Sequence, residues 1–141
     1  MKLPTREEIN VYNSLDEHSA CNNFLGKSLA EVEALLREGY IYPIMDLMWV
    51  GPVAFQFYVF AAIKYIQSSE AENDADVINC FLGLLEFRFE YEQESLKPIA
   101  EELVKACRFI VEHYGQFEIY PEIYGELRPR YEQLIRQLSL K

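Results

Sequence analysis

The sequence predicts an all-α fold, a single-domain bundle of five or six helices that spans residues 1–141 around a central apolar helix at about 52–67. Three observations lead to this prediction. Apolar residues recur at helical spacing along most of the chain. Helix-starting signals precede these stretches, and neither an Asn-Gly hairpin turn nor an alternation of strands and helices occurs. The 141 residues, 50% of them hydrophobic, suit one domain with one core.

Capping boxes mark two predicted helix starts near the N-terminus. A Thr-x-x-Glu sequence at residues 5–8 predicts a helix over about 6–17, because the two side chains satisfy free N–H groups of the first turn. A Ser-x-x-Glu sequence at residues 28–31 repeats the signal. The second helix is expected to end at Gly39, which suits the left-handed position after a helix.

The central stretch decides between a membrane span and a core helix. Residues 40–43 read as an extended connector, because the residue before a proline avoids the helical region, and residues 45–50 read as one short helical turn. The apolar run of about 17 residues that follows is at the lower limit for a membrane span. Gly51-Pro52 interrupts this run near its start. Because proline suits the first turn of a helix, we expect a buried helix of a soluble bundle over residues 53–67.

Three more helices are predicted downstream. Asp74 or Asp76 is expected as the N-cap of a helix over about 75–94, although the alternating sequence EFRFEYE within it would suit a strand if taken alone. Pro98 is expected to open the next helix, which ends near Gly115. The sequence IYPEIYG reads as a turn before a last helix over about 127–138.

The charge and the cysteines limit the partners and the compartment. A net charge of −10 repels phosphates, so we expect neither nucleic-acid binding nor a membrane surface, and the charge favours either plain solubility or a basic partner. The three cysteines are far apart and form no C-x-x-C pair, and the N-terminus lacks the apolar region of a secretory signal. A cytoplasmic protein is therefore expected.

Catalytic and cofactor motifs are not found in the sequence. It contains no H-E-x-x-H or E-x-x-H sequence, no G-x-S-x-G elbow, and neither of the common glycine-rich phosphate loops. The two histidines, His18 and His113, lie at or near predicted helix ends, where a helix dipole favours them. We expect a protein that is not an enzyme and that has no cofactor and no metal.

An acidic surface is the first candidate for function. Between Tyr65 and Leu96 there are eight acidic residues and one basic residue. Glu residues recur at every fourth position from 86 to 94, which places them about 6 Å apart on one ridge of a helix. Carboxylates with nearby tyrosines are typical of surfaces that bind cationic proteins, although an ordinary solvated face looks the same. The predicted partner-binding residues are Asp74, Asp76, Glu86, Glu90 and Glu94.

Arg88 suggests an alternative site. The helical wheel places it inside the apolar arc of its helix, and a buried arginine requires a partner, for which Glu92 and Asp46 are candidates. Arg88 is then either one half of a structural ion pair or the base of a polar pocket. In the second case, the protein would bind a small ligand or act as a regulatory domain. The residues of this predicted pocket are Trp49, Phe55, Tyr58 and Arg88.

The segment MWVGPVAFQFYVFAAIKYI resembles a family of small bacterial helical proteins of unknown function. The resemblance covers about 50 of the 141 residues and rests on Trp49, Pro52, Ala54, Phe55, Phe57 and Tyr58. The family often has a proline after the aromatic pair, where this chain has Val59-Phe60. The chain is also similar in type to the immunity proteins of bacterial toxin systems, which implies a protein that masks a basic toxin domain with its acidic face.

Overall fold

The structure is a computed structural model that describes residues 2–140. Within these residues the chain forms nine α-helices, four short 3-10 helices and no β-strand, which confirms the predicted all-α class. Six of the nine α-helices have nine or more residues. The contacts divide the chain into two compact units, residues 1–65 and residues 66–141, and each is described by itself. The single domain expected for residues 1–141 stays a prediction.

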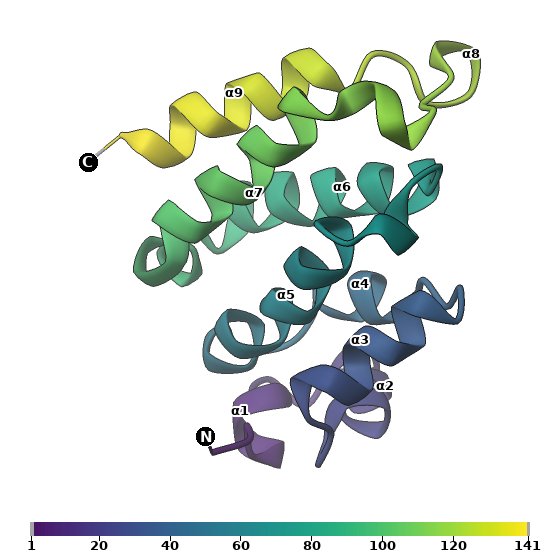
Figure 1. The fold of residues 1–141 in the computed structure, drawn as a ribbon. Helices are drawn as coiled ribbons and strands as arrows, with labels where there is room; N and C mark the ends of the chain where they lie inside the picture. Colours follow the sequence, from purple (N-terminus) through teal and green to yellow (C-terminus); the bar gives the residue numbers. More distant parts are fainter. Residues whose placement is uncertain (1, 141) are drawn as a thin grey trace. The chain divides into compact units, whose positions relative to one another are not determined.

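Unit 1 (residues 1–65) contains the first five helices (Figure 1). They are α1 (Arg6–Ile9), α2 (Leu15–Phe24), α3 (Leu29–Arg37), α4 (Tyr42–Asp46) and α5 (Pro52–Ile66), of which the last ends at the unit boundary. The Ser28–Glu31 capping box at the start of α3 is present, and Gly39 has the expected positive φ of 97°. Both ends of the predicted second helix are thereby confirmed.

The predicted helix over residues 6–17 is wrong. The chain leaves the helix after Ile9 and begins a new one at Leu15, and Asn13 between them has a φ of 59°. The cause is a capping box in Ser14-Leu-Asp-Glu17, in which Ser14 and Glu17 satisfy each other's backbone N–H groups. This second start signal is stronger than the helical spacing that runs through it.

The predicted connector at residues 40–43 and the helical turn at 45–50 are also wrong. Tyr42 and Pro43 form the first turn of α4, which ends at Asp46, and residues 47–49 form turns. Proline disfavours but does not forbid a helical residue before it. Its own missing N–H costs nothing in a first turn, so a helix can begin here.

The apolar helix α5 is confirmed almost to the residue. Nine of its fifteen residues are buried, and Phe60 is half-buried. No helix within residues 2–140 has both the length and the hydropathy that a membrane crossing requires.

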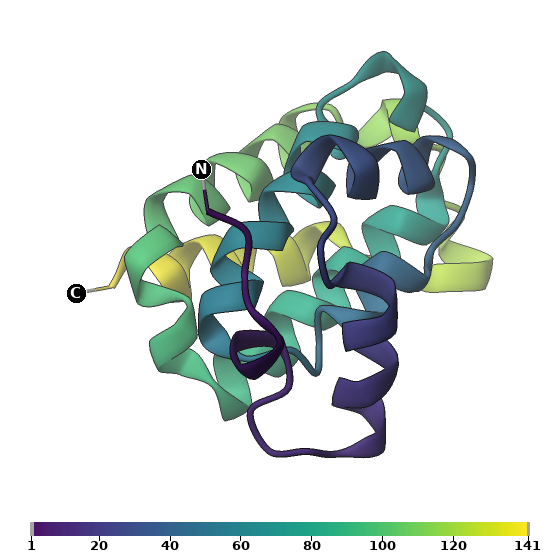
Figure 2. The ribbon, with the colours of Figure 1, turned by 90° about the horizontal axis from the view of Figure 1, so that it is seen from below.

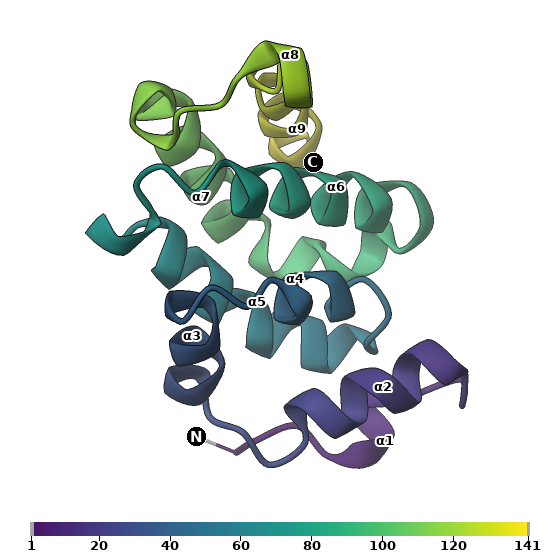
Figure 3. The ribbon, with the colours of Figure 1, turned by 90° about the vertical axis from the view of Figure 1, so that its right-hand side faces the viewer.

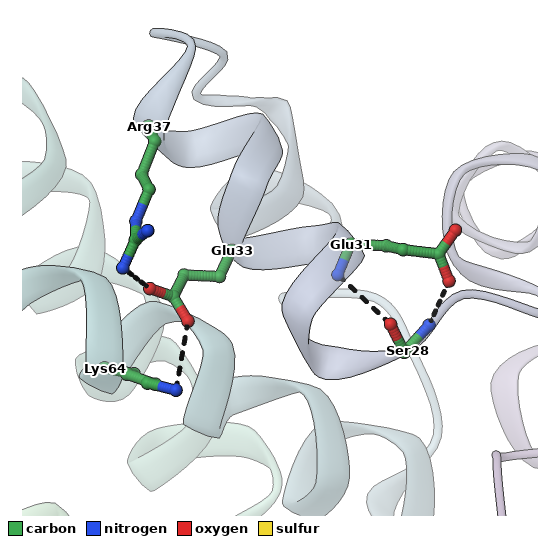
Figure 4. Close-up of polar contacts among 5 residues, drawn as sticks. All are labelled: Ser28, Glu31, Glu33, Arg37 and Lys64. Carbon is green, nitrogen blue, oxygen red and sulfur yellow. Dashed lines mark hydrogen bonds and ion pairs between the residues drawn. The ribbon is translucent and has the colours of Figure 1, made fainter.

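Two polar contacts join α5 to the earlier helices of unit 1. The Tyr58 hydroxyl lies 2.8 Å from the carbonyl oxygens of both Phe24 and Lys27, and its ring stacks on Phe24 with 4.7 Å between the ring centroids. Figure 4 shows the second contact, in which the buried carboxylate of Glu33 pairs with Arg37 and lies 3.8 Å from the Lys64 ammonium. Both contacts fix α5 against the C-terminal end of α2 and against α3.

Unit 2 (residues 66–141) contains the remaining elements. These are η1 (Ser69–Ala71), α6 (Ala75–Tyr91), η2 (Gln93–Ser95), η3 (Lys97–Ile99), α7 (Ala100–Glu112), η4 (Tyr114–Phe117), α8 (Pro121–Tyr124) and α9 (Arg128–Ser139). The EFRFEYE sequence is helical through Tyr91, so the helical interpretation is confirmed there. The predicted turn IYPEIYG contains the one-turn helix α8.

Helices α7 and α9 form an antiparallel pair in unit 2. They lie side by side in Figure 1, and Figure 3 shows α9 nearly along its axis. The Arg128 guanidinium at the start of α9 donates to the carbonyl of Val111 at the end of α7, 2.8 Å away. The buried hydroxyl of Tyr131 donates to the carbonyl of Ile78, which ties α9 to α6 as well. Unit 2 is thus built on α6, α7 and α9.

Candidate functional site

The five acidic residues predicted to bind a partner lie at two ends of α6. Asp74 is the N-cap of this helix and Asp76 lies in its first turn. Glu86 and Glu90 follow 10 and 14 residues after Asp76, about 15 and 21 Å further along the axis. Glu94 lies beyond the helix, in η2, so the predicted helical ridge of three glutamates is wrong at Glu94. The structure therefore separates the predicted set into two groups.

The group at the C-terminal end of α6 is largely paired within unit 2. The Arg130 guanidinium donates two hydrogen bonds to the Glu86 carboxylate, and this bonding raises the pKa of Arg130 above its ordinary value. The Lys97 ammonium lies 2.8 Å from the Glu94 carboxylate. Only Glu90, which is exposed, has no such partner in the described part of the chain. This end of α6 presents little uncompensated charge.

Asp74 and Asp76 have different surroundings. The Asp74 carboxylate accepts a hydrogen bond of 3.3 Å from the Val77 N–H, as expected of an N-cap. The exposed Asp76 carboxylate accepts a hydrogen bond from the Tyr124 hydroxyl of α8, and this bond raises the pKa of Tyr124. Asp76 therefore links the start of α6 to the segment that contains α8.

Further carboxylates gather where this segment meets the start of α6. The Asn73 N–H donates to the Gln116 carbonyl, 2.9 Å away, so residues 72–76 lie next to the chain that enters α8. Between the acids, Tyr120 is 55% exposed and Ile123 is 71% exposed. We call this surface the acidic corner. Its exposed members are Glu72, Asp76, Glu118, Glu122, Glu126, Tyr120 and Ile123.

The sequence contains a local signal for the acidic corner, although IYPEIYG alone predicts only a turn. Pro121 stands in the first turn of α8, and Gly125 at its end has a φ of 75°. A proline and a glycine four residues apart can bracket one helical turn. Glutamates at positions 118, 122 and 126 frame the same turn. Only the folded chain shows that this turn meets the start of α6, where Tyr124 contacts Asp76.

The residues of the predicted pocket belong to different environments. Trp49, Phe55 and Tyr58 are in unit 1 and Arg88 is in unit 2. Trp49 is exposed, whereas Phe55 and Tyr58 are completely buried. Burial raises the pKa of Tyr58 to about 12, with smaller contributions from the charges of Glu31 and Cys21. The Tyr58 hydroxyl is committed to two carbonyl oxygens, which is a structural role.

Arg88 is buried, as the helical wheel predicted. It is 1% exposed, and this burial lowers its pKa to about 10, although the nearby charge of Glu92 acts in the opposite direction. An arginine with this pKa keeps its charge at neutral pH. The proximity of Glu92 favours the structural ion pair over the pocket interpretation.

A groove in unit 2 is formed by other residues. It has a volume of about 680 Å³ and lies between residues 89–108, which lead from the end of α6 into α7, and the C-terminal end of α9. None of the four predicted pocket residues lines it. The residues that do are Phe89, Gln93, Leu96, Lys97, Ala100, Glu101, Val104, Arg108, Gln137, Leu138, Ser139 and Leu140.

Among residues 2–140, no three His, Cys, Asp or Glu side chains are arranged so that they could hold a metal ion. The cysteines are unpaired thiols, and burial raises the pKa of Cys107 to about 12, so that its thiol is protonated and unreactive at neutral pH.

The chain matches no protein-family model, no curated protein and no solved structure.

Proposed function

We propose that this protein is a non-catalytic binding protein that holds a basic partner protein on the acidic corner of unit 2. The partner would be held as immunity proteins hold a toxin domain, by a complementary surface and without chemistry. The observation that carries the proposal is the exposure of Tyr120 and Ile123 between the carboxylates of this corner. Aromatic and aliphatic anchors inside a charged rim are the usual composition of a protein-binding surface.

The distribution of charge supports this choice. Residues 66–141 contain fifteen Asp and Glu against eight Lys and Arg, a net charge of −7 out of the −10 of the whole chain. The acidic corner has no basic residue among its members. Such a surface attracts a cationic partner over several ångströms and speeds its association, and salt weakens this effect.

The corner is a better candidate than the ridge from Glu86 to Glu94. Of the residues predicted to form this ridge, Glu86 and Glu94 are already paired with cations of unit 2. A partner that binds there would have to displace these contacts. Among the carboxylates of the corner, only Asp76 accepts a side-chain hydrogen bond from within residues 2–140, and the Tyr124 hydroxyl leaves its negative charge in place. Glu90 is the one ridge residue that adds to the attraction without such a cost.

The test measures binding to the basic proteins encoded by the genes that flank this protein's own gene. Each is purified and titrated into the chain in a calorimeter at two salt concentrations. The double variant Glu122→Lys, Glu126→Lys changes the corner, and Glu102→Lys, Glu132→Lys makes the same charge change at exposed positions of α7 and α9. We expect the corner variant to weaken binding at least tenfold and the control by less than threefold.

Two results would overturn the proposal. If none of the flanking basic proteins binds, the immunity-type role is wrong. If both variants weaken binding equally, the effect comes from net charge alone and the corner is not the site. A toxin-type partner should also lose its activity when it is bound by the wild-type chain.

The groove favours a second function, the binding of a small ligand in a regulatory domain. Its volume of about 680 Å³ lies within the range of about 300–1,000 Å³ that is usual for ligand pockets. A thermal-shift screen of metabolites tests this, since a ligand that binds only the folded chain raises Tm. The variant Ala100→Trp, which fills the groove, should abolish any such rise. A screen without a single stabilising compound would rule this function out.

A further inference from the structure

The loop that joins α1 to α2 presents large apolar side chains to solvent. Figure 2 shows it as an open connection between the two purple helices. Tyr12 is 75% exposed and Leu15, the first residue of α2, is 88% exposed, while Val11 is exposed to a smaller degree. Single exposed apolar residues are ordinary on protein surfaces, but several adjacent ones are not.

A buried carboxylate holds this loop in one conformation. Glu17 is only 3% exposed. Its Oε1 accepts hydrogen bonds from the N–H groups of Val11 and Tyr12, at 2.8 and 2.9 Å, and its Oε2 accepts from both the N–H and the hydroxyl of Ser14, at 3.0 and 2.8 Å. Every accepting site of the carboxylate is directed at the loop. The backbone is fixed while the side chains of Val11 and Tyr12 are left outside.

The hydrogen bonds from the loop stabilise the ionised form of the Glu17 carboxylate. Burial alone would raise the pKa of Glu17, but the hydrogen bonds from Tyr12, Ser14 and Val11 outweigh burial and lower it. Hydrogen bonds to a charged acceptor are roughly twice as strong as neutral ones. A loop fixed in this way loses little conformational entropy when its side chains enter a partner. The free energy of its apolar contacts therefore contributes to affinity and is not spent on ordering the loop.

The apolar surface continues from the loop to the residues around Gly51. The Gly51 N–H donates to the Ile9 carbonyl at 3.0 Å, and a Cβ at Gly51 would lie within 3.0 Å of a methyl carbon of Val11. Val11 therefore packs on Gly51. Trp49 and Val53, two residues to either side, are exposed as well. We call the surface of Val11, Tyr12, Leu15, Trp49 and Val53 the apolar loop surface.

The charges around this surface indicate what covers it. Glu7 on α1 and Asp16 beside Leu15 are exposed carboxylates. Asp46 on α4 is half-buried and accepts a hydrogen bond from the Asn23 amide; burial raises its pKa against this bond, and the charge of Asp16 acts in the same direction as burial. Arg6, the base next to Glu7 on α1, directs its guanidinium to the Cys21 sulfur, 4.0 Å away. The rim is therefore acidic.

The negative charge of the rim favours one of three possible binding partners of this surface: a second copy of the chain, a membrane, or another protein. A second copy of the chain would bring the same negative rim and a further charge of −10 to the contact. Bacterial membrane surfaces of anionic lipid would repel the rim in the same way. A protein whose apolar pocket is framed by Lys or Arg matches both the side chains and the charges.

We propose that the apolar loop surface is a preformed docking site for a partner protein that offers an apolar pocket framed by Lys or Arg side chains. This site is in unit 1 and goes beyond the acidic corner, which is in unit 2. Tyr12 and Leu15 are the anchors of the contact. Glu17 is a positioning residue that keeps the loop in its binding conformation.

The test places a photo-reactive benzoylphenylalanine at Tyr12 of the full chain in its own host cell. The crosslinked protein is identified by mass spectrometry and purified, and its Kd is measured by calorimetry. The variant Tyr12→Ser, Leu15→Ser removes the anchors. A matched control, Tyr91→Ser, Leu140→Ser, removes the same residue types at positions that are 65% and 78% exposed in unit 2. Circular dichroism confirms that both variants fold.

The expected result is a partner with a basic rim, bound at least thirtyfold more weakly by the loop variant and within threefold of wild type by the control. The variant Glu122→Lys, Glu126→Lys should leave this binding unchanged, so that failure of one site is distinguishable from failure of the other. A crosslink to a second copy, or to no protein, overturns the proposal. So does equal binding by the loop variant, or binding of the wild-type chain to phosphatidylglycerol vesicles that Tyr12→Ser, Leu15→Ser abolishes.

Discussion

The Arg130 guanidinium of α9 holds the Glu86 carboxylate of α6 through two hydrogen bonds, from Nε at 3.0 Å and from Nη2 at 2.5 Å. Two parallel N–H···O bonds are the strongest geometry that a surface arginine and carboxylate can adopt. Glu86 was predicted from the sequence to bind a partner. The structure gives it a partner 44 positions later in the same chain, and the pair joins two of the three main helices of unit 2.

We expect Glu86→Lys to lower the free energy of unfolding, because it places two cations against each other. The neutral variant Glu86→Gln removes the attraction without adding repulsion. Because the Glu86 and Arg130 side chains are 36% and 46% exposed, it should lower the free energy of unfolding by only about 0.5–1 kcal/mol. The double variant Glu86→Lys, Arg130→Glu should regain part of the loss. Urea unfolding of the four proteins in a double-mutant cycle measures this coupling. Glu90→Lys, one turn further along, is the control and should leave stability unchanged.

Two glycines should respond to alanine with opposite signs. At Gly51 an added Cβ would lie within 3.0 Å of the Glu8 carbonyl oxygen and a Val11 methyl carbon, so Gly51→Ala should cost about 1–3 kcal/mol. Gly83 lies inside α6 and a Cβ there meets nothing within 4 Å. Gly83→Ala should stabilise the protein by about 0.5–1 kcal/mol, because alanine loses less backbone entropy in a helix. Thermal unfolding of both variants measures the two effects, and a shared sign would contradict this account.

Tyr58→Phe should destabilise the protein although it changes no apolar contact. The variant removes the one hydroxyl proton shared by the Phe24 and Lys27 carbonyls, each of which lies 2.8 Å from the Tyr58 oxygen, while the Phe24 carbonyl keeps its bond from the Lys27 N–H. Loss of one such hydrogen bond costs about 0.5–1.5 kcal/mol. Tyr40→Phe is the matched control, since the Tyr40 side chain is exposed. Chemical unfolding compares them, and equal stability of the two variants would show that water replaces the hydroxyl at no cost.

Local signals predicted the long helices because these signals agree with one another there. In α5, the proline of the first turn, the apolar run and the closing Lys64 all indicate the same element, and the helix forms where expected. At residues 6–17 two signals compete. The apolar spacing of Ile9, Tyr12 and Leu15 favours one helix, whereas the Ser14–Glu17 capping box begins another. The helix predicted over residues 6–17 rests on the spacing, but Tyr12 and Leu15 are exposed and face no core.

The candidate sites were harder to predict because they depend on contacts between distant residues. Asp74 and Asp76 could be assigned to a helix start from the sequence. That Tyr124 reaches Asp76, 48 positions earlier, depends on the packing of unit 2. The same packing pairs Glu86 with Arg130, which no local pattern indicates. Charge along a chain shows which residues are acidic but not which of them are neutralised.

The stability of the α1–α2 loop should depend on pH through Glu17. The pKa of Glu17 in the folded chain lies below its ordinary value of 4.5. A carboxyl group whose pKa is depressed by folding stabilises the protein fully above its unfolded pKa, and this contribution is lost as the pH falls through the folded pKa. The loop contribution should therefore be constant at neutral pH and decline below about pH 4.5.

The variant Glu17→Gln isolates this contribution, because its amide nitrogen cannot accept from Ser14 and its charge is gone. At pH 7 it should cost about 1.5–3 kcal/mol, the usual worth of hydrogen bonds to a charged group. The difference in unfolding free energy between wild type and variant should shrink as the pH falls below 4.5, and amide exchange of Val11 and Tyr12 should accelerate in wild type over the same range. Glu7→Gln, at an exposed position of α1, should show no difference at any pH. A wild-type advantage over Glu17→Gln that is the same at pH 6 and pH 3 would mean that shape, and not charge, holds the loop.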